Sequence, residues 1–127
     1  MKSYDFGILS PFEFECFVRD ILCERDSIDY SSFAEGRDCG IDLRASYGEG
    51  KKIIVQAKRY KTRKELKQEL KIEIDKVKKI NPDRYIVATS VDLTVGNVDE
   101  IRNMFSSYMK DDTDVLGLQY RRQYLYY

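Results

Sequence analysis

Histidine and tryptophan are absent from this chain of 127 residues, and proline occurs only twice. The lack of histidine excludes a histidine general base, a Ser-His or Cys-His nucleophile and most zinc sites. Three cysteines, Cys16, Cys23 and Cys39, form an odd set, which is typical of a reduced protein; we expect them to pack rather than react. Catalysis by this chain must therefore use carboxylates, lysines, tyrosines or a hard metal ion on oxygen ligands.

Long apolar runs are also missing. No stretch approaches the ~18 consecutive apolar residues that a membrane span requires, so we expect no membrane partner. Residues 1–15 lack the apolar block of a signal peptide, which favours a cytoplasmic location. With 43% hydrophobic and 35% charged residues, the composition is that of a globular domain. We expect one domain over residues 1–117, followed by a tyrosine-rich tail of unknown role at 118–127.

The net charge of zero conceals an uneven distribution. Residues 1–50 carry 5 basic and 11 acidic side chains, residues 51–79 carry 12 and 4, and residues 80–127 carry 5 and 7. A basic middle segment in a neutral chain indicates a local surface that faces a polyanion. A solvated, lysine-rich helix is the competing interpretation of the same residues.

Hydrophobic periodicity and turn residues predict an α/β fold with the order α-β-β-β-α-β-α. Ser10, Pro11 and Glu13 have the pattern of a helix start. The expected elements are a helix to about Arg25, strands at 28–33, 41–45 and 52–59, a helix at 62–79, a strand at 85–89 and a helix holding residues 98–108. Such an order predicts a small mixed β-sheet flanked by helices.

The hairpin between residues 41 and 59 has a predictable register. A three-residue loop at 48–50 pairs Tyr47 with Lys51, so paired residue numbers sum to 98. Asp42 then lies opposite Gln56, with Lys58 diagonal to Asp42. Side chains alternate along strands, which leaves one face apolar and expected to be core. The polar face holds Asp42, Arg44, Ile54, Gln56 and Lys58, and the apolar face holds Ile41, Leu43, Ala45, Ile53, Val55 and Ala57.

The polar face has a chemical use. Mg²⁺ prefers oxygen ligands, and Asp42, Gln56 and the main-chain carbonyl of Ala57 supply them. Lys58 either orients or deprotonates an attacking water, or neutralises charge on a phosphorane. Glu15 flanks the apolar stripe of the first helix, so we assign it to the same site as a further acidic group.

Three short segments together resemble the Mrr-like branch of the PD-(D/E)xK nuclease superfamily, in which glutamine commonly stands two residues before the lysine. The segments are Phe14-Glu15, Gly36-x-Asp38-x-Gly40-Ile41-Asp42-Leu43 and Val55-Gln56-Ala57-Lys58-Arg59-Tyr60. The resemblance implies a restriction-endonuclease-like core and an Mg²⁺-dependent endonuclease that cleaves DNA, with Mn²⁺ as a possible substitute. It assigns Asp42 and Gln56 as metal ligands, Lys58 as the catalytic lysine and Glu15 as the metal-binding or supporting glutamate.

Residues 84–97 are similar to nuclease domains fused ahead of STAND-type ATPases in bacterial antiviral proteins. That likeness implies a defence or restriction effector and a regulatory ATPase, either C-terminal or separate. The last residues, 118–127, do not match such a continuation, so an excised domain, a truncated relative and a stand-alone nuclease all stay open. Double-strand cutting needs two active sites, which leads us to expect a homodimer or larger homo-oligomer.

DNA contacts are expected just after the catalytic strand. The candidates are Arg59, Tyr60, Lys61, Arg63 and Lys64. Arg59 and Tyr60 are equally well interpreted as plain surface residues. Two alternative functions also stay open: a Holliday-junction-resolvase-like or repair nuclease, and a catalytically silent module for DNA binding or oligomerisation.

Overall fold

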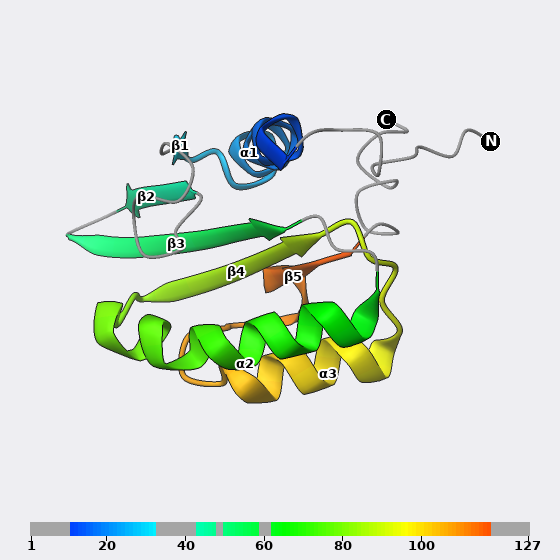
Figure 1. The fold of residues 1–127 in the computed structure, drawn as a ribbon. Helices are drawn as coiled ribbons and strands as arrows, with labels where there is room; N and C mark the ends of the chain where they lie inside the picture. Colours follow the sequence, from blue (N-terminus) through cyan, green and yellow to red (C-terminus); the bar gives the residue numbers. More distant parts are fainter. Residues whose placement is uncertain (1–10, 33–42, 48–49, 59–61, 118–127) are drawn as a thin grey trace.

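The computed structural model describes residues 11–32, 43–47, 50–58 and 62–117, and it has three layers (Figure 1). A five-stranded sheet forms the middle layer, with one helix on one face and two on the other. The expected element order is confirmed, and a short 3-10 helix and a fifth strand follow it. The elements are α1 (Pro11–Asp26), β1 (Ser31–Ser32), β2 (Leu43–Tyr47), β3 (Lys51–Lys58), α2 (Arg63–Ile80), β4 (Arg84–Thr89), α3 (Val95–Met104), η2 (Asp112–Asp114) and β5 (Val115–Leu116).

The sheet is mixed, with strand order β1-β2-β3-β4-β5. The first three strands are antiparallel and the last three are parallel. The register predicted for the hairpin is confirmed where the structure describes it, from Leu43 opposite Val55 to Tyr47 opposite Lys51. Strand β1 is shorter than expected, because two residues of the 28–33 segment pair with β2 within the described part of the chain.

Both faces of the sheet carry a hydrophobic core. On the α1 side, Phe14, Val18 and Leu22 pack with Ile53 and Val55, as the alternation predicted. On the other side, α2 and α3 pack over a second core. That core includes Ile54, Leu66, Leu70, Val77, Tyr85, Val87, Ile101 and Phe105. The face of the hairpin that was expected to be polar is therefore also buried, because α2 and α3 cover Ile54 and its neighbours.

Local signals define the helix ends. The side chain of Thr62 accepts the Glu65 backbone N–H at 3.2 Å and begins α2, and Asn81 ends that helix in the left-handed conformation. Helix α3 begins at a capping box formed by Thr94 and Asn97 and ends at Met104, earlier than expected, so Tyr108 lies in the turns beyond. Among the described helices, none combines the length and the apolar character needed to cross a membrane.

Candidate active site at the carboxyl end of β3

Gln56 lies near the carboxyl end of β3, in the middle of the sheet. Its side chain is 3% exposed, and its neighbours Val55 and Ala57 belong to the core on the α1 side. Because side chains alternate along a strand, Gln56 occupies the opposite face, which α2 and α3 cover. Lys58 is the last residue of β3, where its backbone pairs with Thr89 of β4. Gln56 and Lys58 therefore lie on one strand, two residues apart, as predicted.

The amide of Gln56 has a hydrogen-bond partner that sequence reasoning missed. The hydroxyl of Tyr85, on the neighbouring strand β4, donates to Gln56 Oε1. Both side chains are almost fully buried. The signal for this contact was a tyrosine at the start of an otherwise aliphatic strand, but identifying its partner required the parallel register of β3 and β4.

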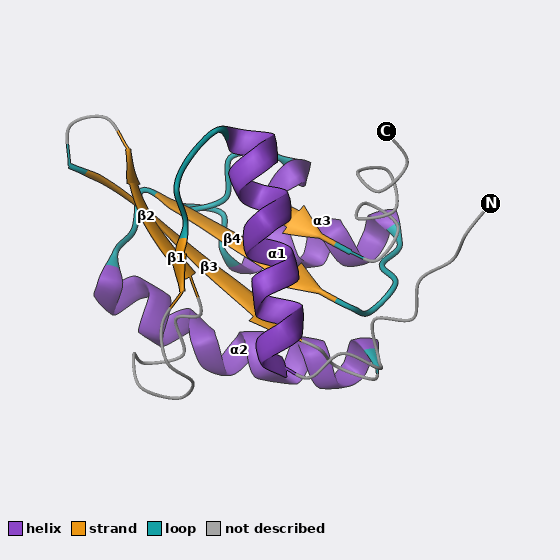
Figure 2. Cartoon of the chain, turned by 90° about the horizontal axis from the view of Figure 1, so that it is seen from above, coloured by secondary structure: helices purple, strands orange, loops and turns teal. Residues whose placement is uncertain are grey.

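Glu15 faces the interior, as predicted. It is 3% exposed, whereas Glu13 is exposed. Two views agree that the first turns of α1 lie over the carboxyl end of β3 (Figures 1 and 2). Since α1 covers the other face of the sheet, Glu15 and Gln56 approach this end of β3 from two different layers. The structure places both buried polar groups at one end of the sheet, but not on one face.

Several predicted site residues lie outside the described residues. These are Asp42, Arg59, Tyr60 and Lys61, and of Lys58 only the backbone is described. The register that places Asp42 opposite Gln56 is confirmed up to Leu43, the next residue along the chain. The assignment of Asp42 to the site therefore stays a prediction that now depends on a one-residue extension of the observed ladder.

Arg63 and Lys64 begin α2 and are both exposed. The guanidinium Nε of Arg63 donates to the carbonyl of Asp92 at 2.9 Å, which ties the start of α2 to the segment after β4. Lys67, one turn later, pairs with Glu100 of α3 at 2.7 Å. The lysines of α2 are exposed or half-exposed, as the solvated-helix interpretation expects, whereas Glu73 is buried and contacts Lys76 at 3.5 Å. The first turn of α2 thus presents positive charge next to the carboxyl end of β3.

The donor atoms at this end suit a hard cation. Glu15 and Gln56 offer carboxylate and amide oxygens, and Mg²⁺ is bound by oxygen rather than by sulfur or imidazole. Within the residues that the structure covers, no three histidine, cysteine, aspartate or glutamate side chains cluster as a metal site. The main-chain carbonyl of Ala57 is a further oxygen on the same strand, and Asp42, the acidic residue that the hairpin register predicts here, lies outside the described residues.

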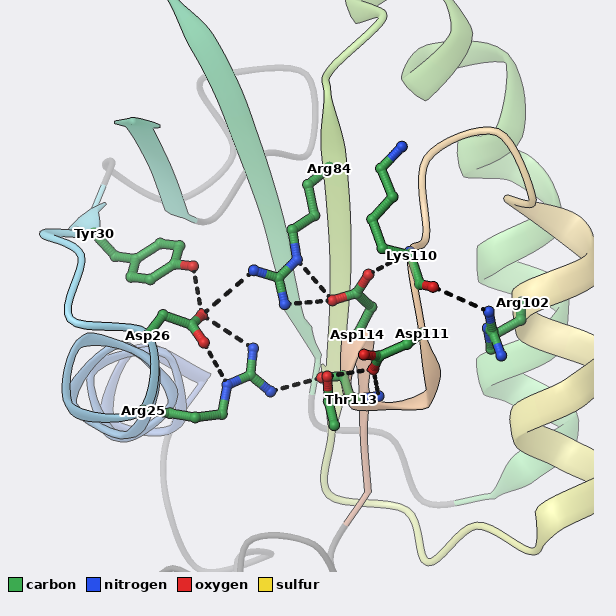
Figure 3. A network of polar contacts seen from close by, with 9 residues as sticks. All are labelled: Arg25, Asp26, Tyr30, Arg84, Arg102, Lys110, Asp111, Thr113 and Asp114. Carbon is green, nitrogen blue, oxygen red and sulfur yellow. Dashed lines mark hydrogen bonds and ion pairs between the residues drawn. The ribbon is translucent and has the colours of Figure 1, made fainter. Parts of the chain in front are cut away.

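A second polar cluster lies at the opposite end of β4 (Figure 3). Arg84, the first residue of β4, contacts the fully buried Asp114 at 2.6 Å and Asp26 at 3.9 Å. Asp26 also accepts hydrogen bonds from Arg25 and from the Tyr30 hydroxyl, each at 2.7 Å. Together Arg25, Asp26, Tyr30, Arg84 and Asp114 form what we term the Arg84 network, which joins α1, β4 and η2.

The Arg84 network shifts the pKa values of its members. Burial alone raises the pKa of Asp26, but hydrogen bonds from Arg25 and Tyr30 and the nearby guanidinium charges outweigh it and bring that pKa below its ordinary value. Burial and the hydrogen bond to Asp26 raise the pKa of Tyr30. Burial by itself lowers the pKa of Arg84. The hydrogen bond and the charge of Asp114 raise that pKa by more than burial lowers it, so the net shift is upward. These shifts favour the fully ion-paired state of the cluster.

Comparison with known proteins supports the assignment drawn from the motifs. The restriction endonuclease family, in its Mrr catalytic form, matches residues 8–105. Uncharacterized protein y4cD of Sinorhizobium fredii (strain NBRC 101917 / NGR234) is 33% identical over 117 residues. The alignment covers 91% of this chain but 18% of y4cD, so the chain spans less than a fifth of that relative. The matched segment includes Glu15, Gln56 and α2 and ends before η2 and β5.

Proposed function

We propose, because this chain belongs to the restriction endonuclease family of Mrr catalytic domains, that it is a metal-dependent endonuclease acting on DNA. The observation that carries the proposal is the buried Gln56, two residues before Lys58 on β3, the strand whose carboxyl end lies under the first turns of α1 (Figure 2). The partner that the structure shows for this buried amide is the uncharged hydroxyl of Tyr85. Defence against foreign DNA is the biological role that we propose for the activity.

Asp42, Gln56 and the carbonyl of Ala57 would hold Mg²⁺, and Glu15 would bind it or support its ligands. When bound, the metal would lower the pKa of a bound water and stabilise negative charge on the phosphoryl group. Mn²⁺ has the same preference for carboxylate and carbonyl oxygen, so we expect it to substitute. The donor set contains two carboxylates, one side-chain amide and one main-chain carbonyl, which leaves positions for water and for a phosphate oxygen.

Lys58 would act on the attacking water or on the phosphoryl group itself. As a base it would take a proton from the water as the new P–O bond forms and the bond to the leaving oxygen breaks. As an ammonium it would offset the extra negative charge of the transition state. Arg63 and Lys64 would contact the DNA backbone together with Arg59, Tyr60 and Lys61, which gives affinity without sequence preference.

A plasmid-nicking assay tests the proposal. The parent protein is assayed with Mg²⁺, with Mn²⁺ and with EDTA, beside Asp42→Ala and Lys58→Ala. Lys51→Ala is the matched control, because Lys51 is an exposed lysine at the other end of the same strand. We expect cutting that requires metal, is lost in both site variants and is retained in Lys51→Ala.

The same assay separates the alternatives. DNA binding by the parent and by Asp42→Ala, without metal-dependent cutting by either, would contradict an active nuclease and favour a silent binding module. A strong preference for branched over linear duplex would favour a resolvase-like or repair enzyme over a defence nuclease. Equal cutting by Lys58→Ala and the parent would remove Lys58 from the site.

Double-strand cleavage requires two active sites, so we propose that the active form is a homodimer or a larger homo-oligomer. Light scattering coupled to gel filtration, with and without duplex DNA, measures this directly. A monomer in both conditions would contradict the assembly. A regulatory ATPase acting with the nuclease, either in the same chain or as a separate protein, is a further partner that we propose for the natural system.

A further inference from the structure

We infer that Tyr85 is a positioning residue for Gln56: its hydroxyl fixes the orientation of the amide through which Gln56 would bind the metal. This inference rests on the proposed function and extends it to a residue of β4. The contact is diagonal across the parallel pair of strands, since Gln56 lies opposite Val87 and Tyr85 lies opposite Ile54. The hydrogen bond therefore joins side chains whose residues are offset by two positions along the paired strands.

Tyr85 is held firmly enough to act as a reference point. Its side chain is 1% exposed, and its ring packs against Phe105 with centroids 4.7 Å apart and planes at 48°. Its backbone N–H donates to the carbonyl of Tyr108 at 3.0 Å, in the turns after α3. The hydroxyl is thus positioned by two contacts with the segment that follows β4.

The chemistry of the amide explains why such a partner matters. A glutamine side chain ends in an oxygen acceptor and a nitrogen donor, and only the oxygen can bind a cation. A hydroxyl proton directed at Oε1 distinguishes these two ends, and the carbonyl oxygen keeps a second lone pair for a metal ion. Hydrogen bonds to a ligand residue usually orient it and tune the metal. An uncharged ligand attracts a cation less strongly than a carboxylate does, so its orientation has more influence on affinity.

The test measures Mn²⁺ binding by the whole chain, without DNA, using calorimetry or electron paramagnetic resonance. Tyr85→Phe removes the hydroxyl and keeps the ring that packs against Phe105. We expect Mn²⁺ to bind Tyr85→Phe about 10–100-fold more weakly than it binds the parent. Unchanged or tighter Mn²⁺ binding by a folded Tyr85→Phe would overturn the inference.

Tyr30→Phe is the matched control. Tyr30 is also buried, and its hydroxyl also donates to one side chain, that of Asp26, but at the other end of the sheet. We expect Tyr30→Phe to lower thermal stability and to leave the Mn²⁺ affinity of the parent unchanged. An equal loss of Mn²⁺ affinity in both variants would show a general effect of stability and would overturn the positioning role.

A measurement on the unaltered protein covers the case in which Tyr85→Phe does not fold. The side-chain amide signals of Gln56 are followed by NMR during a Mg²⁺ titration. We expect these signals to shift while the Tyr85 hydroxyl proton stays protected from solvent. Loss of that protection would mean that Gln56 leaves Tyr85 to bind metal, which overturns the inference. Metal binding that depends on Asp42 but not on Tyr85 would also overturn it, while leaving the proposed nuclease intact.

Discussion

The two ends of the β3–β4 pair bury polar side chains in different ways. At the amino end of β4, Arg84 lies between Asp26 and Asp114, so the charges of the protein neutralise one another. At the carboxyl end of β3, Gln56 is engaged by the uncharged hydroxyl of Tyr85. The first arrangement is complete without a ligand and stabilises the fold. The second leaves an oxygen-rich position where, on our proposal, a cation and a phosphate complete the site.

The largest expected effect distinguishes the two ends by function. Lys58→Ala should reduce the rate of metal-dependent cleavage about 10²–10⁴-fold, the usual contribution of a positioned proton-transfer group. The free energy of unfolding should stay close to that of the parent, because Lys58 is the last residue of β3, at the opposite end of the sheet from the Arg84 network. Single-turnover cleavage and urea unfolding measure the two quantities. A stability loss that explains the whole activity loss would contradict the comparison.

The next effect belongs to the other end. Asp114→Asn removes the charge that pairs with Arg84 and should lower the free energy of unfolding by about 3–5 kcal/mol, as breaking a buried ion pair usually does. Cleavage by the folded fraction should be unchanged. Asp112→Asn is the control, because Asp112 pairs with Arg102 at 2.8 Å on the surface and should contribute about 0.5 kcal/mol or less. Equal losses in both variants would contradict the distinction between buried and exposed pairs.

A smaller effect of the Arg84 network should appear in the pH dependence of the free energy of unfolding. The folded pKa of Asp26 is lowered, so this carboxylate stabilises the fold above its unfolded value of 3.8, and the contribution is lost as pH falls through the folded pKa. Asp26→Asn should therefore reduce the dependence of unfolding free energy on pH below about pH 5. Asp111, whose pKa is lowered by hydrogen bonds from Thr113, should keep part of that dependence in the variant. Urea titrations from pH 6 to pH 3 would measure it, and parallel curves for parent and variant would contradict the assignment.

The smallest effect compares two lysines on one helix. Lys64 lies in the first turn of α2, beside the carboxyl end of β3, and Lys79 lies in its last turn, at the other end of the sheet; both are exposed. If DNA binds over the proposed site, Lys64→Ala should reduce the salt dependence of DNA affinity by about one phosphate contact. Lys79→Ala should not change it. Equal reductions would indicate binding along the whole helix.

The sequence predicted best what depends on neighbouring residues. The glycine-bounded loop and the alternation of β2 and β3 determined the hairpin register, and helix periodicity distinguished buried Glu15 from exposed Glu13. The helix predicted at 62–79 is observed as α2, which Thr62 and Asn81 cap. The roles of Asp42 and Lys58 remain predictions from motif and register.

Contacts between distant segments were not predictable in the same way. Strand β5 has two residues and becomes a strand by pairing with Val87 and Ala88. The partner of Gln56 depends on how a parallel strand aligns across the intervening helix α2. The Arg84 network combines residues whose individual sequence contexts resemble ordinary surface charges. The sheet has a core on each face because helices pack on both sides of it. Helical periodicity shows which side of a helix is apolar, but not which strands that side contacts.

The bond from Arg25 to the carbonyl of Thr113, at 2.6 Å, joins residues 88 positions apart. Closing so long a loop has an entropic cost before any contact can offset it, and folds rich in such contacts form slowly. We therefore expect the Arg84 network to form late in folding, after the hairpin and α2 have formed from local contacts. If these ion pairs form after the transition state, weakening them should raise the unfolding rate more than it lowers the refolding rate.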